Sequence, residues 1–119
     1  MTLILILPWP PRDLSPNARH AHWSALARAK KRFRLACAWQ ARAQGAARIT
    51  APALAISMTF SPPDRRHRDL DNCIASMKAG LDGLADVLGV DDGKWTLTAV
   101  LDHEQIGGFV RVEVSPWQA

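Results

Sequence analysis

A short acidic segment in the middle of the chain carries residue types that can hold a divalent metal. Asp69 and Asp71 are separated by a single leucine, and the pair Asp91-Asp92 follows farther along. In an extended segment alternate side chains point the same way, so Asp69 and Asp71 would project together. Two close carboxylates repel unless a cation or a proton lies between them. Hard oxygen ligands suit Mg²⁺, with Mn²⁺ as a possible substitute, so the spacing predicts a divalent-metal site.

The residues after Asp71 extend this predicted site along a helix. Asp71, Ala75, Lys78 and Asp82 are spaced by four, three and four residues, which places them on one helical face. Lys78 could then neutralise a phosphate oxygen or the negative charge that develops in a transition state. Asn72 could hydrogen-bond a carboxylate or a metal-bound water. Asp91-Asp92 would supply a further ligand only if the loop that carries them folds back to the start of the helix.

Each of these residues also has a purely structural interpretation. Asp69 or Asp71 could be a helix N-cap, a position that favours Asp. Asp91-Asp92 before Gly93 could be an ordinary turn, and Lys78 with Asp82 a surface ion pair worth a few tenths of a kcal/mol. From the residue types and spacings alone, both interpretations stay open.

The basic residues are concentrated in the first half of the chain. The formal net charge is +4, and residues 12–48 contain nine Lys or Arg against one acid, Asp13. Such a distribution favours a polyanionic partner, although a solvated helix face is the simpler alternative. The predicted DNA contacts are two groups of cations, one beside the acidic segment and one along a helix: Arg65, Arg66, Arg68, Arg28, Lys31 and Arg32.

The pattern of apolar residues predicts the elements that must position these groups. Short apolar runs predict strands at 3–7, 54–60, 95–101 and 109–114, the last two forming an antiparallel hairpin. A helix capped by Ser24 would run to residue 44 and end at Gly45, and a second would span 71–88 and end at Gly89. The order β-α-β-α-β-β over residues 1–119 predicts one α+β domain, two helices against a small mixed sheet.

Other features limit the cellular setting. Cys37 and Cys73 have no paired spacing, which favours two buried thiols in a reducing compartment. The N-terminal apolar run is too short for a membrane span and follows no basic residue, so a cytoplasmic protein without a membrane partner is expected. Trp9, Trp23 and Trp95 are expected in the core, with a wedge against unstacked bases as the alternative.

Several of these segments together resemble the RusA family of Holliday-junction resolvases, found in bacteria and their phages. Residues 63–72, Pro-Asp-Arg-Arg-His-Arg-Asp-Leu-Asp-Asn, are similar to the family's signature, and Gly89-Val90-Asp91-Asp92 to its second acidic element. The opening strand with Leu7-Pro8-Trp9-Pro10-Pro11, and Ser15-Pro16-Asn17 before a basic helix, are similar in place. The resemblance covers nearly the whole chain.

This resemblance implies a magnesium-dependent endonuclease, acting as a homodimer, that resolves four-way DNA junctions in recombination and repair. It implies Asp69, Asp71 and Asp92 as essential carboxylates, Asp91 as a neighbouring metal ligand, and Asn72 as the signature asparagine. Some members carry a catalytic lysine three residues after that asparagine, where this chain has Ala75. Lys78 is expected to substitute for it.

Two other functions compete with a junction-cutting enzyme. The Ala75 departure would fit a binding module for branched DNA or RNA whose acidic cluster no longer turns over. A metal-dependent hydrolase of small phosphate esters is less consistent with the basic helix, because a small substrate needs no such surface.

Overall fold

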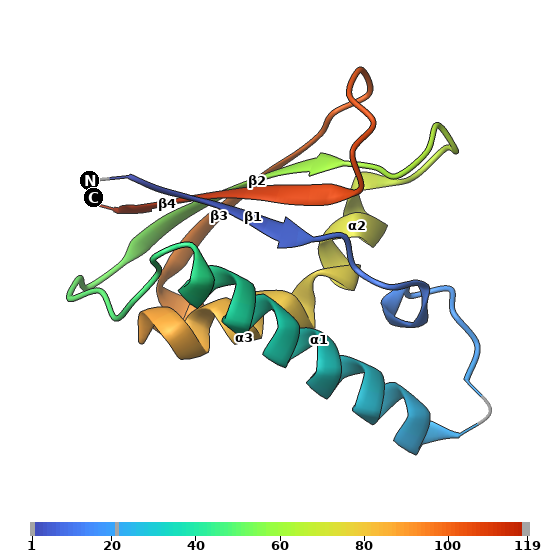
Figure 1. Cartoon of the computed structure of the whole chain (residues 1–119), viewed down its shortest axis with the longest axis horizontal. Helices are drawn as coiled ribbons and strands as arrows, with labels where there is room; N and C mark the ends of the chain where they lie inside the picture. Colours follow the sequence, from blue (N-terminus) through green and yellow to red (C-terminus); the bar gives the residue numbers. More distant parts are fainter. Residues whose placement is uncertain (1, 21, 118–119) are drawn as a thin grey trace.

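A four-stranded mixed sheet, with all its helices on one face, organises the protein (Figure 1). The computed structural model describes residues 2–20 and 22–117. The strands lie in the order β1-β4-β2-β3. β4 is antiparallel to both of its neighbours, and β2 and β3 are parallel. The strands are β1 (Leu3–Pro8), β2 (Leu54–Ser61), β3 (Trp95–Leu101) and β4 (Phe109–Pro116).

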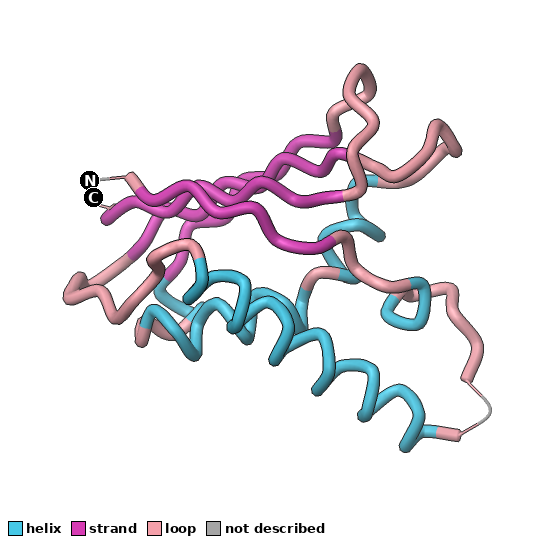
Figure 2. The backbone as a smooth tube through the Cα atoms, viewed as in Figure 1, coloured by secondary structure: helices cyan, strands magenta, loops and turns pink. Residues whose placement is uncertain are grey.

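The helices form a second layer on the sheet, as the tube in Figure 2 shows. They are α1 (Trp23–Ala43), α2 (Leu70–Ser76) and α3 (Lys78–Leu88). Two short 3-10 turns are η1 (Arg12–Leu14) and η2 (Asp92–Lys94). Together the elements form one α+β domain with a mixed sheet, which confirms the predicted fold class.

The core lies between the sheet and the helices, and strand alternation builds it. Val110, Val112 and Val114 of the interior strand β4 are fully buried. Every second residue of β2 joins them, which is the period-two pattern of a strand with one face on a core. The opposite face of the sheet is not covered by a described helix, and Ile4 and Ile6 of β1 are exposed.

α1 and α3 pack closely because α3 has glycine at two contact positions. A Cβ on Gly83 would lie 2.2 Å from the backbone oxygen of Arg34, and one on Gly80 would lie 2.8 Å from a ring carbon of Phe33. The predicted core stripes are confirmed at Phe33 and Cys37 of α1, which are buried against this contact.

Gly83→Ala is therefore expected to lower the free energy of unfolding. Overpacking should cost roughly 1–3 kcal/mol, and the higher helix propensity of alanine should offset about 1 kcal/mol of that cost. Urea denaturation followed by circular dichroism measures the change. Gly80→Ala is the matched comparison and should cost less, because its nearest atoms belong to the side chains of Phe33 and Cys37. A Gly83→Ala protein as stable as the wild type would contradict this account of the α1–α3 contact.

The predicted hairpin of the last two strands is wrong. β3 pairs in parallel with β2 and lies at the edge of the sheet, whereas β4 inserts between β1 and β2. The connection over residues 102–108 crosses the end of β2. There the backbone N–H of Gly108 donates to the Ser61 carbonyl, and that of Asp102 to the Phe60 carbonyl. The valine-rich β4 buries more apolar surface in the interior of the sheet than it would beside an edge strand.

The second predicted helix is broken into two. α2 ends at Ser76 and α3 begins at Lys78, with Met77 between them and a visible change of direction (Figure 1). The Ser76 hydroxyl donates to the Asn72 carbonyl at 2.8 Å, a side-chain bond that often bends helices. The fully buried Met77 side chain fixes the joint in the core. The predicted face from Asp71 to Asp82 is therefore divided: Ala75, Lys78 and Asp82 line one cavity, whereas Asp71 borders another.

The start of α1 also differs from the prediction, whereas both helix ends closed by glycine agree with it. His22, not Ser24, is the N-cap, and its Nδ1 accepts a hydrogen bond from the Ser24 backbone N–H. Gly89 caps α3 in the left-handed conformation, with φ of 73°. Gly45 follows α1 with φ of 97°.

Candidate functional site

A groove runs between the loop of residues 9–20 and the start of α2 and α3. It consists of two adjoining cavities of about 710 and 560 Å³ that share Ser15 and Ser76. The larger is lined by α1 through Lys30, Lys31 and Arg34, and also by Lys78. The smaller contains Asp69 and Asn72 and is bordered by three arginines, Arg12, Arg66 and Arg68. The groove thus passes from a basic wall to the predicted acidic site.

The arginine-rich segment before Asp69 is held in place by its own side chains. Nη1 of Arg68 lies 2.8 Å from Oδ1 of Asp64, and its guanidinium lies 5.4 Å from the ring centre of Trp9. Trp9 in turn packs edge-on against Phe60 of β2. This series of contacts connects the segment to the sheet and fixes where Asp69 stands. The bond from Arg68 also holds the pKa of Asp64 far below its usual range.

Two of the three arginines predicted to bind DNA in this segment therefore have internal partners. Arg68 is mostly buried between Asp64 and Trp9. Arg66 reaches Asp64 at 3.3 Å but remains largely exposed. Arg65 is exposed on the loop and lines a hollow with Gln105 and Ile106. The segment presents Arg65 and Arg66 to solvent, and Arg68 acts as its anchor.

Asp69 and Asp71 line the same hollow, although they do not lie on one extended segment. Asp69 ends the extended stretch, whereas Asp71 is the second residue of α2. Both border a hollow of about 620 Å³ beside the end of β3, where Leu101 and His103 form the other wall. This hollow meets the groove at Arg68 and Asp69. Both residues of the predicted acidic pair therefore line one hollow.

Neither carboxylate is consumed by helix capping. Asp69 occupies the N-cap position of α2, but its side chain accepts no cap hydrogen bond. It lies instead 3.1 Å from Nε2 of the exposed His67. Asp71 accepts only the backbone N–H of Asn72 among the described contacts, at 2.9 Å. Asp69 and Asp71 are both exposed, and their carboxylate oxygens can still bind further partners.

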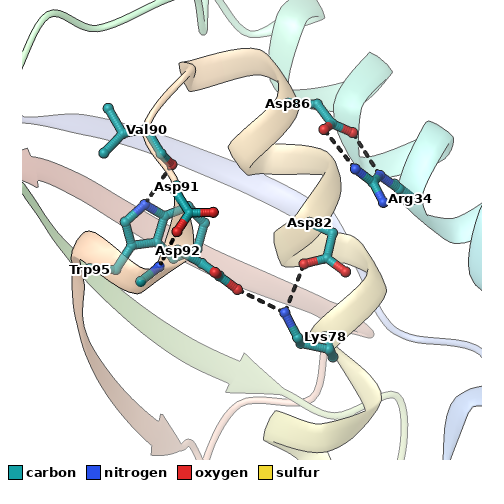
Figure 3. A network of polar contacts seen from close by, with 9 residues as sticks. Arg34, Lys78, Asp82, Asp86, Val90, Asp91, Asp92 and Trp95 are labelled. Carbon is teal, nitrogen blue, oxygen red and sulfur yellow. Dashed lines mark hydrogen bonds and ion pairs between the residues drawn. The ribbon is translucent and has the colours of Figure 1, made fainter.

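The loop after α3 folds back only as far as the start of α3, and it brings Asp92 to Lys78 (Figure 3). The Lys78 ammonium donates to Asp82 at 2.8 Å and to Asp92 at 2.7 Å. The indole N–H of Trp95 donates to the Val90 carbonyl at 3.1 Å and fastens the loop to the start of β3. The Lys78–Asp82 surface pair considered from the spacing is thus formed, and Asp92 is added to it.

Asp91 and Asp92 have different roles in this loop. Asp91 caps the η2 turn by accepting the Gly93 backbone N–H at 3.0 Å. Asp92 points to Lys78, whose ammonium lowers the pKa of that carboxyl. In return Asp82 first, and then Asp92, raise the pKa of Lys78. Lys78 and Asp92 therefore each stabilise the charged form of the other.

Carboxylate oxygens are suitable ligands for Mg²⁺, but the predicted carboxylates lie in two separate places. Asp69 and Asp71 offer hard oxygen ligands in one hollow. Asp92 stands with Lys78 on the α3 side. Among residues 2–20 and 22–117, no three His, Cys, Asp or Glu side chains form a group that could hold a metal ion. A magnesium site would therefore rest on Asp69 and Asp71, and Asp92 would join it only by exchanging its bond to Lys78.

The outer wall of the groove is a helix without a single acidic residue. α1 carries six cations over its 21 residues. Arg34 is engaged with Asp86 through two hydrogen bonds of 2.7 and 2.8 Å, which raise its own pKa and lower that of Asp86. Arg28, Lys31 and Arg32 are exposed, as predicted. The remaining two cations of α1 are Lys30, which lines the groove, and Arg42, which is exposed near the end of the helix.

The prediction for the tryptophans was right for two and wrong for one. Trp9 and Trp95 are half-buried and pack against the core. Trp23 is 76% exposed, because it begins α1 beyond the reach of the sheet. Trp39 and Leu35 are also exposed on α1, and their residue types alone predict no role for them. Their position off the helix's apolar stripe was the signal that could have singled them out.

Fold and groove together define a small α+β protein with a groove that runs from the basic helix α1 to Asp69. No model of a known protein family matches the chain. It is 39% identical over 103 residues to an uncharacterized protein of Xylella fastidiosa (strain Temecula1 / ATCC 700964), with 84% of this chain and 67% of that protein covered. The chain therefore belongs to the family of that Xylella protein. None of the described helices has both the length and the apolar character needed to cross a membrane.

Proposed function

We propose that this protein is a magnesium-dependent endonuclease that cuts branched DNA, with four-way junctions as the substrate. The observation that carries the proposal is the position of Asp69 and Asp71. Both exposed residues line one hollow, which shares Arg68 and Asp69 with the groove, and the larger cavity of that groove is walled by the acid-free helix α1. Polyphosphate backbones need a cationic wall, and phosphodiester cutting commonly needs a carboxylate-held metal.

The residues would divide the work as follows. Asp69 and Asp71 would hold Mg²⁺, which when bound supplies a Lewis acid for the phosphate and lowers the pKa of an attacking water. Asn72, which lines the groove beside Asp69, would orient a carboxylate or a water by hydrogen bonding. Arg65 and Arg66, with Arg28, Lys31 and Arg32 of α1, would hold backbone phosphates. Lys78 would neutralise charge on the phosphate being cut, with Asp92 keeping its ammonium in position.

Resolution of a junction also needs two symmetric cuts, so we propose that the enzyme acts as a homodimer with two sites. The sheet face that no described helix covers, with Ile4 and Ile6 exposed, offers a surface for the second copy. Sedimentation equilibrium of the purified chain tests this. A monomer both alone and with junction DNA would contradict it.

The decisive experiment is a cutting assay on an end-labelled four-way junction with Mg²⁺ and with EDTA. Paired nicks at symmetric positions near the branch point, in the Mg²⁺ lane alone, are expected. A linear duplex of the same sequence is the matched substrate and should be cut much less. Mn²⁺ is expected to restore cutting after chelation.

A non-catalytic module that binds branched nucleic acid is the second candidate. The observation that favours it is the division of the carboxylates, since Lys78 already neutralises Asp92. Junction binding in both lanes, without product in either, would support this module and overturn the nuclease.

A further inference from the structure

The outward face of α1 carries two exposed apolar side chains in the middle of a basic surface. Leu35 is 52% exposed and Trp39 is 68% exposed. Residues 28, 32, 35, 39 and 42 follow one another at spacings of four and three, so they lie along one face of the helix. We call Arg28, Arg32, Leu35, Trp39 and Arg42 the Trp39 stripe. It spans about 21 Å of helix at 1.5 Å per residue.

This face is turned away from the core of the protein. The buried residues of α1 lie on the opposite side and include Phe33, Cys37 and Ala41. Large apolar side chains exposed next to each other on a polar helix face commonly mark a binding surface. Trp39 therefore has no packing role in the described fold that would explain its presence.

The charge around Trp39 selects the kind of partner. α1 contains no acidic residue. Within the described chain, Arg28, Arg32 and Arg42 have no carboxylate within ion-pair distance, whereas Arg34 is neutralised by Asp86. A second copy packed stripe against stripe would oppose like charges on both sides of the indole. A polyanion with exposed aromatic faces is complementary to both parts of the surface.

The stripe is continuous with the groove. Lys31 lines the larger cavity, and it precedes Leu35 by one helical turn. A strand that leaves the groove over Lys31 would next meet Leu35 and Trp39. Arg32 and Arg42 lie on either side of that path along the helix.

We propose that the Trp39 stripe binds single-stranded DNA, with an unpaired base stacked on the Trp39 indole and Arg32 and Arg42 on the adjacent phosphates. Stacking on an aromatic side chain is open only to bases whose faces are free, and base pairs inside a duplex have none to spare. The stripe thus selects unpaired DNA, such as the strand exposed at a branch or a gap. This inference rests on the proposed function in taking DNA as the substrate.

The test compares the affinity of the full chain for a labelled oligothymidylate and for a duplex of equal length, by fluorescence anisotropy. Trp39→Ala is expected to weaken binding to the single strand roughly 5- to 150-fold, the effect of losing one stacked base. Binding to the duplex should change by less than about twofold. Trp39→Phe should restore much of the single-strand affinity, because it retains an aromatic face.

Trp117→Ala is the matched control, because Trp117 is an exposed tryptophan that follows β4 and lies outside α1 and its stripe. It should bind both DNAs like the wild type. Arg32→Ala should weaken both and reduce the salt dependence of binding, since it removes a phosphate contact. Circular dichroism checks that each variant is folded.

Equal effects of Trp39→Ala on both DNAs, or no effect on either, would overturn the stacking site. So would a dimer that Trp39→Ala converts to monomer, because a second copy would then be the partner. The junction-cutting assay is read separately. If Trp39→Ala selectively loses single-strand binding but the wild type does not nick the junction, the stacking site is supported and the nuclease is rejected. If the wild type nicks the junction but Trp39→Ala binds the single strand as the wild type does, the nuclease is supported and the stacking site is rejected.

Discussion

Asp71→Asn is expected to abolish junction cutting while leaving junction binding close to that of the wild type. The substitution removes the negative charge that would hold Mg²⁺ but keeps the shape of the side chain. Its amide oxygen can still accept the Asn72 N–H that Asp71 accepts at 2.9 Å, so the start of α2 should be undisturbed. A loss of roughly 10²–10³-fold or more in the cutting rate is expected, comparable to removing a key group that stabilises a transition state.

Single-turnover cutting and gel-shift affinity on the same junction separate the two effects. Asp13→Asn is the matched control, because Asp13 is an exposed acid of η1 outside the groove lining. It should cut at the wild-type rate. Full activity of Asp71→Asn would reject Asp71 as a metal-holding residue.

Lys78→Ala is the second variant with a large expected effect. It distinguishes a structural role of the Lys78 ammonium, as a surface ion pair, from a role in neutralising the phosphate that is cut. As a surface ion pair on a side chain that is 63% exposed, Lys78 should add no more than about 1 kcal/mol to stability. As a group that neutralises the phosphate, it should be worth roughly 10²-fold in the cutting rate. We expect the second result, with a melting temperature close to that of the wild type.

Two further variants sharpen the Lys78 test. Lys78→Arg keeps the positive charge near Asp92 and should recover part of the activity. Asp82→Asn removes the partner one turn along α3 but leaves the bond to Asp92. Its cutting rate should change little. If Lys78→Ala lowers only the melting temperature and not the rate, Lys78 is a structural residue of the η2 loop.

The separation of Asp92 from Asp69 and Asp71 predicts that DNA binding and metal binding affect each other. Asp69 and Asp71 share a hollow with the end of β3, whereas Asp92 is bonded across the start of α3. Bound DNA phosphates bring additional negative charge to Lys78, which would compete with Asp92 for the ammonium. Junction binding and metal binding are therefore expected to reinforce one another. Isothermal titration calorimetry of Mg²⁺ into the wild-type protein, with and without a junction that cannot be cut, would measure this coupling.

Local sequence was sufficient to define most of the elements. The residues of β3 were predicted to the residue, and the ends of α1 and α3 at glycine followed from the need for a left-handed cap. The buried stripe of α1 through Phe33 and Cys37 was visible in its helical spacing. These features depend on contacts within a few residues, so the chain itself encodes them.

The tertiary structure alone decided which strands pair and how the acidic groups meet. β4 lies beside β1 and β2 because sheet order depends on total apolar burial, which no local pattern reveals. The break at Met77 separates Asp71 from Lys78, and the return of the η2 loop gives Lys78 to Asp92 instead. The anchoring of Arg68 between Asp64 and Trp9 is likewise a long-range result.

The acidic pair itself shows both contributions. The one-residue spacing of Asp69 and Asp71 predicted two carboxylates facing one space, and they do border one hollow. The sequence left open which of them is the N-cap of the following helix, and it could not show that the Asp69 side chain would make no cap hydrogen bond. Side-chain spacing is set by local backbone geometry, whereas the freedom of a carboxylate depends on every neighbour that the fold brings to it.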